Sequence, residues 1–144
     1  MAQTLFPFFG DTQTATAETE SMPLYKETAW DFERNIPIIE KGDFKIVEGN
    51  EAIKTWVYKA MKTERFRYQI YSWDFGSELH SLIGQSYTPN LTKAEAIRYI
   101  KETLLINPYI RNVSNVEVTF SGGTLTINAK LETIYGEMEV STNV

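Results

Sequence analysis

Hydrophobic and polar positions follow different periods along the chain, and the first stretch has no period at all. The residues before Pro23 are rich in Thr, Ala, Ser and Gln, with three acids and no base. A stretch of this composition cannot bury enough apolar surface to offset its chain entropy. We therefore predict an extended N-terminal arm over residues 1–30 and a single domain over residues 31–144.

A short aromatic cluster, Phe6, Phe8 and Phe9, lies near the start of this arm. Large apolar side chains on an unfolded tail are a liability unless something covers them. One interpretation is that the tip of the arm docks on a partner and becomes ordered there. The alternative is a frayed terminus, which is common in proteins.

The first helical period runs from Glu51 to Lys62. Apolar residues recur there at intervals of three and four, which places them on one face of a helix. Asn50 is expected to be the N-cap, with Glu51 near the positive end of the helix dipole. The predicted buried stripe consists of Ile53, Trp56, Val57, Ala60 and Met61.

A second helix is predicted from Thr92 to about Ile106. Thr92 as N-cap and Glu95 three residues later would form a capping box. Pro108 should stop the helix, because proline cannot continue it. The predicted buried stripe consists of Ala96, Ile97, Ile100, Leu104 and Leu105.

Between the helices, Phe66 to Trp73 alternates like a strand, with aromatic side chains on both faces. Such a strand would be covered on both sides or would form a contact surface. Arg65 and Arg67 could grip an acidic partner, although a solvated strand face is the simpler interpretation. Asp74–Ser77 then breaks the strand, and a short helix should follow over residues 79–83.

Two short strands are predicted before the first helix. Ile36 and Ile38 share one face, and the chain turns at Lys41-Gly42-Asp43 before a second apolar group. Pro37 limits the first strand to a sheet edge, because proline has no N–H to donate.

The C-terminal third alternates as an antiparallel β-meander. A two-residue turn at Gly122-Gly123 would bring apolar residues of two strands face to face. The turn and the apolar pattern therefore select the same register. The expected pairs are Phe120 with Leu125, Val118 with Ile127, and Val116 with Ala129.

A second turn at Tyr135-Gly136 would place Leu131 opposite Val140 and Thr133 opposite Met138. The last strand is then a candidate edge strand with a free row of backbone donors and acceptors. We predict an α+β fold with a small mixed sheet, two main helices and a C-terminal antiparallel β-meander.

Composition excludes several classes of function. The chain has 144 residues, a formal net charge of −5, one His and no Cys. The lack of Cys excludes disulfide scaffolds and thiol catalysis, and one His cannot form a multi-histidine metal site. An acidic chain is a poor nucleic-acid binder, because that affinity depends on Lys and Arg at phosphates. No apolar run reaches the roughly 20 residues that span a bilayer. We expect no cofactor, no metal, no nucleic acid and no membrane partner.

The candidate catalytic groups are weak. Asp74 with Glu78, and Glu137 with Glu139, are carboxylate pairs of the kind that a glycosidase places across a sugar cleft. Such pairs arise by chance in a chain with 19 acids. His80 has a serine beside it, but no carboxylate is placed to orient its ring. We expect no catalytic residue and no enzyme activity; the alternative is a small cell-wall glycan hydrolase that uses a carboxylate pair.

The order of the elements and one short motif resemble a known family. The chain carries Asp74-Phe75-Gly76-Ser77 and then Leu79 after its first helix, and Asn107-Pro108-Tyr109-Ile110 after its second. Over about residues 40–141 this resembles the baseplate wedge or sheath-initiator family of contractile phage tails, whose members were once labelled lysozyme-like. The likeness is greatest to baseplate proteins of PBSX-type prophages and phage-tail bacteriocins. The residues that match the family motif are Asp74, Phe75, Gly76, Ser77, Leu79, Pro108 and Ile110.

One part of the motif departs from the family. Where the family has Glu and Arg on either side of the proline, this chain has Asn107 and Tyr109. A salt bridge at that place is therefore not carried over to this chain.

The resemblance implies a structural role. Such proteins sit between the baseplate wedge and the first sheath ring, in six copies around the tail tube, and seed the sheath by offering strands that sheath arms extend. The implied partners are sheath protein, baseplate wedge proteins, and tube or hub proteins. The implied location is the bacterial cytoplasm during assembly, and a phage virion or tail-like particle after lysis. The residues expected to contact partners are Phe6, Phe8, Phe9, Glu137, Met138, Glu139 and Val140.

Overall fold

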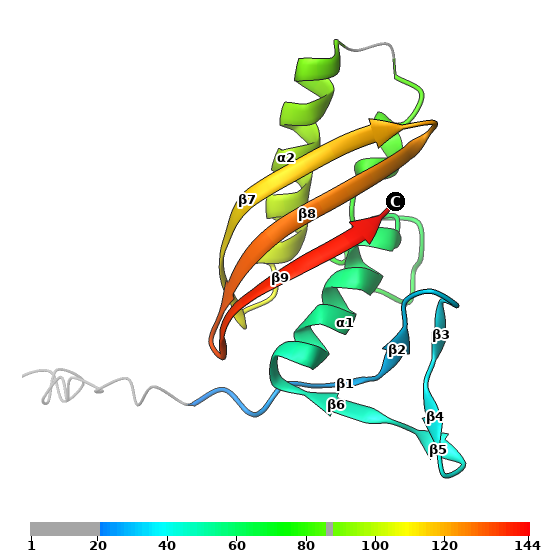
Figure 1. Ribbon diagram of the computed structural model, residues 1–144, viewed down its shortest axis with the longest axis vertical. Helices are drawn as coiled ribbons and strands as arrows, with labels where there is room; N and C mark the ends of the chain where they lie inside the picture. The colour runs from blue at the N-terminus through cyan, green and yellow to red at the C-terminus, as the bar shows by residue number, and fades with distance from the viewer. Residues whose placement is uncertain (1–20, 86–87) are drawn as a thin grey trace, which may run out of the picture.

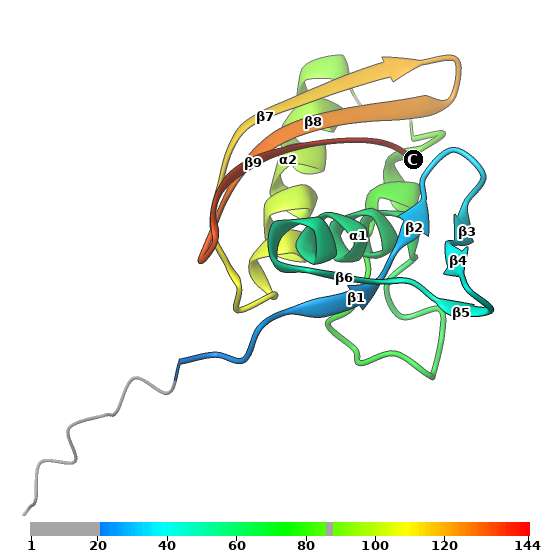
Figure 2. The same cartoon turned by 60° about the horizontal axis from the view of Figure 1, so that its bottom comes forward.

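The computed structural model describes residues 21–85 and 88–144. Figures 1 and 2 show three layers: a C-terminal sheet, two helices beneath it, and short N-terminal strands beyond the first helix. The predicted α+β class and C-terminal meander are confirmed. In chain order the elements are β1 (Lys26–Thr28), β2 (Trp30–Asp31), β3 (Ile36–Pro37), β4 (Ile39–Glu40), β5 (Asp43–Phe44), β6 (Ile46–Glu48), α1 (Gly49–Lys62), a 3-10 helix (Leu79–Leu82), α2 (Pro89–Leu105), β7 (Ile110–Ser121), β8 (Thr124–Thr133) and β9 (Gly136–Asn143).

The core lies between the sheet and the two helices. Alternate residues of β8 point toward the helices, because successive side chains of a strand face opposite sides. Each large aliphatic side chain buried there contributes about 1.5–3 kcal/mol. The core residues that are fully shielded from solvent, at 0% exposure, include Ile53, Leu79, Ile100, Leu125 and Leu131.

Helix α1 begins at Gly49, two residues before the predicted start, and its N-cap is Glu48 with no side-chain cap. The prediction that Asn50 caps the helix is wrong. Its side-chain Oδ1 accepts a hydrogen bond from the Thr133 hydroxyl, which ties the start of the helix to the end of β8. The predicted stripe is buried except for Trp56, which is partly buried and packs against the edge of the core.

Helix α2 begins at Pro89, earlier than predicted, and Thr88 is its N-cap. Proline suits the first helical position, since its missing N–H has no partner there. Thr92 therefore lies inside the first turn, where its hydroxyl donates to the Thr88 carbonyl oxygen at 3.1 Å. The predicted capping box is wrong for this reason. The helix ends at Leu105, as the position of Pro108 predicted.

The first hairpin of the meander has two of its three predicted pairs. Phe120 lies opposite Leu125 and Val118 opposite Ile127, but the register shifts between Ser114 and Glu117. An irregularity of this kind leaves extra residues on one strand without partners. The predicted pairing of Val116 with Ala129 is wrong because Val116 lies inside the irregularity.

The second turn of the meander lies one residue earlier than predicted, which shifts the register of the hairpin by two residues. Leu131 is opposite Met138, and Thr133 is opposite Gly136. The Thr133 hydroxyl oxygen accepts the N–H of Tyr135 at 3.1 Å, which closes the turn one step sooner. A shift of two residues keeps every side chain on its predicted face, because the strand period is two.

The N-terminal strands form three short antiparallel pairs. The predicted turn after β4 is confirmed: Lys41 and Gly42, with φ of 54° and 83°, join β4 to β5. This left-handed pair is typical of two-residue hairpins. Residues 26–28, which the sequence assigned to the arm, form β1 and pair with β6. The predicted extended arm therefore stays a prediction for the residues before Lys26.

Three tyrosines hold the point at which the N-terminal segment enters the domain. The Tyr109 hydroxyl donates to the Pro23 carbonyl oxygen at 2.8 Å, and the Tyr25 N–H donates to the Tyr135 hydroxyl oxygen at 2.8 Å. The rings of Tyr25 and Tyr109 have centroids 4.7 Å apart. Tyr109 thus fixes the direction in which the chain enters β1.

High pH should weaken this junction in a measurable way. Burial, assisted by the nearby Glu27 carboxylate, raises the pKa of Tyr25 from 10.0 to about 12. The folded state then holds the proton more tightly, so the stability is full below about pH 10 and is lost as the pH rises toward 12. We expect the free energy of unfolding in urea to fall more between about pH 9 and 11 for the wild-type chain than for Tyr25→Phe. Equal losses in the two proteins would contradict the buried hydroxyl.

Candidate interaction surfaces

Strand β9 is one edge of the meander, whose strand order is β7-β8-β9. All eight residues of the strand pair with β8 in one continuous register, from Gly136 opposite Thr133 to Asn143 opposite Thr126. Among the described residues, no strand pairs with the other side of β9. The edge is therefore regular along its whole length and is paired with no other described strand.

The backbone of β9 points alternately toward β8 and away from it. Leu125 and Val144 exchange both of their backbone hydrogen bonds, at 2.9 and 2.8 Å. In an antiparallel ladder such exchanging pairs alternate with non-bonded pairs. Counting back along the register, the residues whose N–H and C=O groups face outward are Glu137, Glu139, Ser141 and Asn143.

The opposite edge, β7, is less suited to accept another strand. Its register with β8 shifts between Ile110 and Asn112 and again between Ser114 and Glu117. Such irregularities twist an edge and interrupt its row of donors and acceptors, which is one way that proteins block edge pairing. The structure thus leaves β9 as the regular free edge.

The predicted partner-binding residues of β9 divide between its two faces. Val140 is 7% exposed and points into the core, and Met138 packs partly against the same core. Glu137 and Glu139 are exposed on the outer face. Glu137 pairs with Lys130 of β8 at 2.8 Å, and this hydrogen bond raises the pKa of Lys130 above its usual range.

The outer face of the meander is polar. A shallow hollow of about 460 Å³ lies beside the β9 edge, and carboxylate, amide and hydroxyl groups outnumber the cations around it. A partner on this face would therefore meet hydrogen-bonding groups rather than an apolar patch. The polar side chains that line the hollow are Lys54, Asn115, Glu117, Asn128, Lys130, Glu139 and Ser141.

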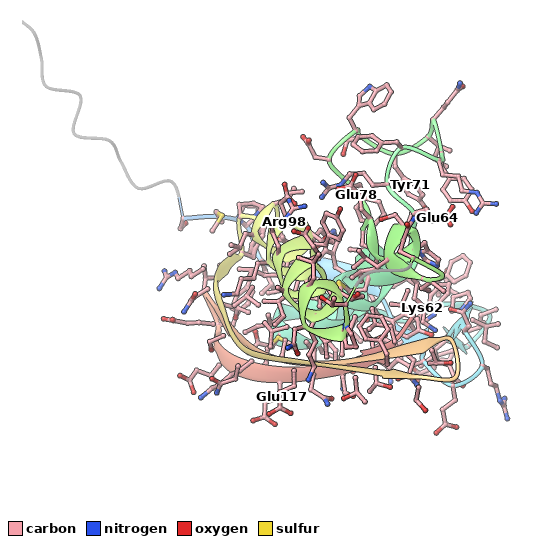
Figure 3. All side chains as sticks on the ribbon, turned by 90° about the horizontal axis from the view of Figure 1, so that it is seen from above. Lys62, Glu64, Tyr71, Glu78, Arg98 and Glu117 are labelled. Atoms are coloured by element: carbon pink, nitrogen blue, oxygen red, sulfur yellow. The ribbon has the colours of Figure 1, made fainter. Side chains whose placement is uncertain are left out.

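Residues 64–77 form a loop, here called the aromatic loop, on the far side of the helices from the sheet. Figure 3 shows Tyr71 on this loop and Glu117 on the opposite, outer face of the meander. The segment Phe66–Trp73 within it is not a strand, so that prediction is wrong. Phe66 has a left-handed backbone with φ of 67°, and the rings stack on one another instead of facing two sides of a sheet.

Two residues of the family motif close the aromatic loop. The N–H of Ser77 donates to the Thr63 carbonyl oxygen at 2.8 Å, and the Arg65 N–H donates to the Ser77 carbonyl oxygen at 3.0 Å. The Ser77 hydroxyl donates to the carbonyl oxygen of Met61, in the last turn of α1, at 2.8 Å. Ser77 is 1% exposed, so these bonds are shielded from water. The sequence motif includes Ser77, but it does not predict which groups Ser77 contacts.

Gly76 allows this closure. Its φ is +104°, and a Cβ at that position would lie 2.7 Å from the carbonyl oxygen of Thr63 and 3.0 Å from the backbone nitrogen of Arg65. Real Cβ atoms do not approach backbone atoms so closely, and side chains rarely adopt this φ. A residue larger than glycine would therefore force the loop away from α1.

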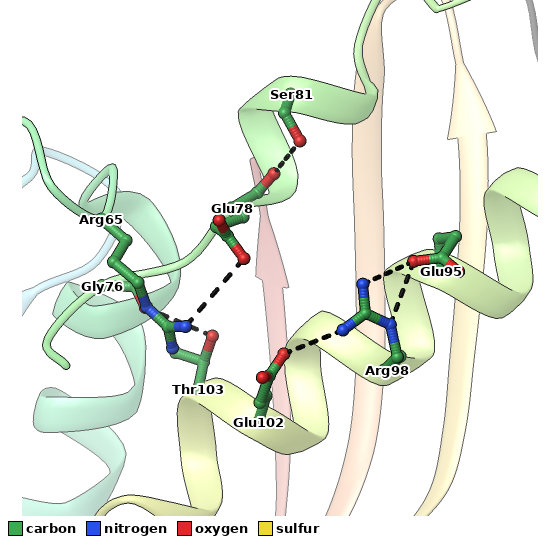
Figure 4. A network of polar contacts seen from close by, with 8 residues as sticks. All are labelled: Arg65, Gly76, Glu78, Ser81, Glu95, Arg98, Glu102 and Thr103. Carbon is green, nitrogen blue, oxygen red and sulfur yellow. Dashed lines mark hydrogen bonds and ion pairs between the residues drawn. The ribbon is translucent and has the colours of Figure 1, made fainter.

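The Gly76 carbonyl oxygen also joins the loop to α2, as Figure 4 shows. It accepts hydrogen bonds from Arg65 Nε at 3.2 Å and from the Thr103 hydroxyl at 3.3 Å. The Arg65 guanidinium lies 4.0 Å from the Glu78 carboxylate, and its side chain is 10% exposed. Bonds to charged donors in such shielded places are stronger than bonds at the surface. The base of the loop is thus held by both helices.

The other motif residues have simpler positions. Leu79 and Ile110 are buried in the core, and Phe75 packs edge-on against the indole ring of α1. Asp74 and Pro108 are exposed. Nothing in the structure explains Asp74.

One carboxylate of each pair considered for catalysis is engaged with a cation. Glu78 lies 4.0 Å from Arg65 and Glu137 pairs with Lys130, whereas Asp74 and Glu139 make no ion pair with another described residue. In residues 21–85 and 88–144, no group of three or more His, Cys, Asp or Glu side chains could hold a metal ion. No helix of the described chain is long and apolar enough to cross a membrane. The aromatic residues of the predicted arm, Phe6, Phe8 and Phe9, lie outside the described residues.

Comparison with known proteins identifies relatives of this chain. Residues 26–136 match the model of a family described as contractile injection system sheath initiator. The chain is also 33% identical, over 97 residues, to the Phage-like element PBSX protein XkdS of Bacillus subtilis (strain 168). That match covers 67% of this chain and 69% of the relative.

The role assigned to Gly76 can be measured by two glycine substitutions. Gly76→Ala should lower the free energy of unfolding by about 3 kcal/mol, because it adds a backbone clash to the cost of a left-handed φ. Gly136→Ala is the matched control: its φ is +116°, but nothing lies within 4 Å of its Cβ position. It should cost only about 1–2 kcal/mol. Equal losses in urea denaturation would show that the contact with Thr63 is not what requires glycine.

Proposed function

Because the chain belongs to the family of contractile injection system sheath initiators, we propose that it seeds the sheath of a contractile tail by β-augmentation. In this proposal the free edge of β9 is the template on which a strand of sheath protein adds. The observation that carries the proposal is the regular edge itself, in which Glu137, Glu139, Ser141 and Asn143 turn their backbone groups outward. Main-chain hydrogen bonds give such complexes affinity, and side chains give them specificity.

The energy of strand addition favours assembly in a ring. Each added backbone hydrogen bond contributes about 0.5–1.5 kcal/mol net. Ordering each residue of the incoming strand costs about 1–2 kcal/mol. These amounts nearly cancel, so one initiator would hold one sheath strand weakly. Several copies held side by side would bind a ring of sheath subunits far more tightly, because later contacts become intramolecular.

Charges on the edge favour a foreign strand over a second copy of β9. Glu137 and Glu139 stand beside the outward backbone groups. If two β9 edges paired with each other, carboxylates would face carboxylates, which is destabilising. A sheath strand with Lys, Arg or hydroxyl side chains at these places would instead be attracted. The edge is thus kept free until its partner arrives.

The remaining parts of the proposal rest on the resemblance to the family. We place the protein between the baseplate wedge and the first sheath ring, in six copies around the tube. Its partners would be sheath and wedge proteins, together with tube or hub proteins. Assembly would take place in the bacterial cytoplasm, and the product would be a virion or tail-like particle.

This role requires no catalysis, and we propose that the chain is not an enzyme. A hydrolase that uses a carboxylate pair would need two acids free to face a sugar across a cleft. One acid of each candidate pair instead faces a cation: Glu78 lies 4.0 Å from Arg65, and Glu137 lies 2.8 Å from Lys130. These ion pairs favour the structural role over the hydrolase.

Proline at an outward-facing position of β9 tests strand addition. Glu139→Pro removes an N–H that points away from β8, so the folded chain should lose only about 1 kcal/mol. The partner strand would lose a central hydrogen bond and meet a proline ring. We expect particles built with this variant, viewed by electron microscopy, to have baseplates and tubes but at least about tenfold fewer sheaths.

Two matched variants separate the edge from other effects. Glu139→Ala removes the charge but keeps the N–H, and it should allow most sheaths to form. Phe120→Pro places proline at an outward position of the irregular edge β7, where Phe120 is 41% exposed, and it should also allow sheaths. Normal sheaths with Glu139→Pro would overturn strand addition on β9.

A further inference from the structure

The aromatic loop exposes more apolar surface than a folded chain usually leaves in water. Soluble proteins rarely expose a contiguous apolar patch unless it binds something. The strand addition proposed above uses the opposite side of the molecule and does not cover this loop (Figure 3). The exposed side chains, with their exposed fractions, are Phe66 57%, Tyr68 48%, Ile70 84%, Tyr71 46% and Trp73 76%.

The four aromatic side chains of this set, Phe66, Tyr68, Tyr71 and Trp73, line a hollow of about 270 Å³ together with Gln69 and Ser72. Sites for small-molecule ligands usually measure about 300–1,000 Å³, so this hollow is better matched to one or two side chains of a docked peptide. Phe66 and Trp73 form one wall, with ring centroids 5.5 Å apart. Tyr68 and Tyr71 form another, with centroids 6.2 Å apart. Aromatic-lined grooves of this kind commonly receive segments that contain proline.

The hollow is held in shape before anything binds. The ends of the aromatic loop that carries it are joined by backbone bonds between Thr63, Arg65 and Ser77, and the loop is bonded to α2 through Gly76. Tyr71 also packs on Phe75, with ring centroids 4.7 Å apart. A preformed site loses less entropy on binding than one that must first become ordered.

The occupant is indicated by apolar character, since the charges of the loop are already balanced. Arg65 and Arg67 are paired with Glu78 and Glu64, and the exposed rings remain without cover from the described residues. The first twenty residues of the chain contain a matching apolar and aromatic segment around a proline, Leu5-Phe6-Pro7-Phe8-Phe9. We propose that the aromatic loop of one copy receives this N-terminal segment from a second copy.

The direction in which the chain leaves the domain favours a second copy. Tyr109 and Tyr135 hold Pro23 and Tyr25, and residues 21–25 then run away from the aromatic loop (Figures 1 and 3). Twenty residues span at most about 66–72 Å when extended, which sets the greatest distance from which a neighbouring loop could receive the segment. Reaching its own loop would require the segment to double back past the domain. This inference rests on the proposed function, because the ring is what places copies side by side.

Peptide titration of the full chain tests the inference in solution. The peptide of residues 1–20 contains no Trp, so it can be added to about 1 µM protein while Trp73 fluorescence reports on the hollow. The protein is the full chain with Phe6, Phe8 and Phe9 changed to Ser, which leaves the loop available. We expect saturable binding that becomes at least about tenfold weaker in Tyr68→Ala/Tyr71→Ala. Phe44→Ala, at an equally exposed aromatic residue on the β4–β5 hairpin, should stay within about twofold.

The wild-type chain decides which copy supplies the segment. If each arm occupied its own loop, its high effective concentration would weaken binding of the added peptide at least about tenfold. We expect wild type and the arm variant to bind the peptide equally at this dilution. A tenfold weaker wild type, no saturation, or equal binding by Tyr68→Ala/Tyr71→Ala would overturn the inference. None of these results affects the sheath assay with Glu139→Pro. The inference about the N-terminal segment can therefore fail while strand addition on β9 still holds.

Discussion

The structure depends on one constraint: the meander has a single apolar face, and the two helices must cover it. Leu125, Ile127 and Leu131 of β8 are buried against α1 and α2. Because the helices cover this face rather than an edge, β9 keeps a full row of outward backbone groups. The second edge is interrupted by its register shifts. The burial of the apolar face and the free backbone edge of β9 are thus consequences of the same arrangement of layers.

Side-chain periodicity was enough to predict both helices, the meander and the face of each strand, because these depend on which residues must be buried. Turns and caps depend on single contacts that periodicity does not encode. Asn50 bonds to Thr133 across the fold, and Thr133 closes the second turn one residue earlier, which shifts the register by two. The aromatic loop alternates like a strand, so periodicity predicts a strand where the chain forms a loop. Only the closure at Gly76 and Ser77 shows that the segment must turn back.

The motif residues also have structural roles that their residue types alone do not reveal. Gly76 and Ser77 form the closure of a loop, and Leu79 anchors the following turn in the core. Tyr109, which follows the second helix, holds the N-terminal segment by donating a hydrogen bond to the Pro23 carbonyl oxygen. The residues of β9 predicted to contact a partner include only half of those whose backbone groups face outward, Glu137 and Glu139. The alternation of backbone bonds adds Ser141 and Asn143, which can be found only from the strand register and not from residue types.

The central claim is that β9 is completed by a strand of another protein. The most direct measurement is a cryo-electron microscopy map of the assembled particle at side-chain resolution, with the sheath extended. The account predicts a sheath strand hydrogen-bonded to Glu137, Glu139, Ser141 and Asn143 of each copy. A map in which this edge faces solvent, or in which the sheath contacts only other surfaces of the chain, would contradict it.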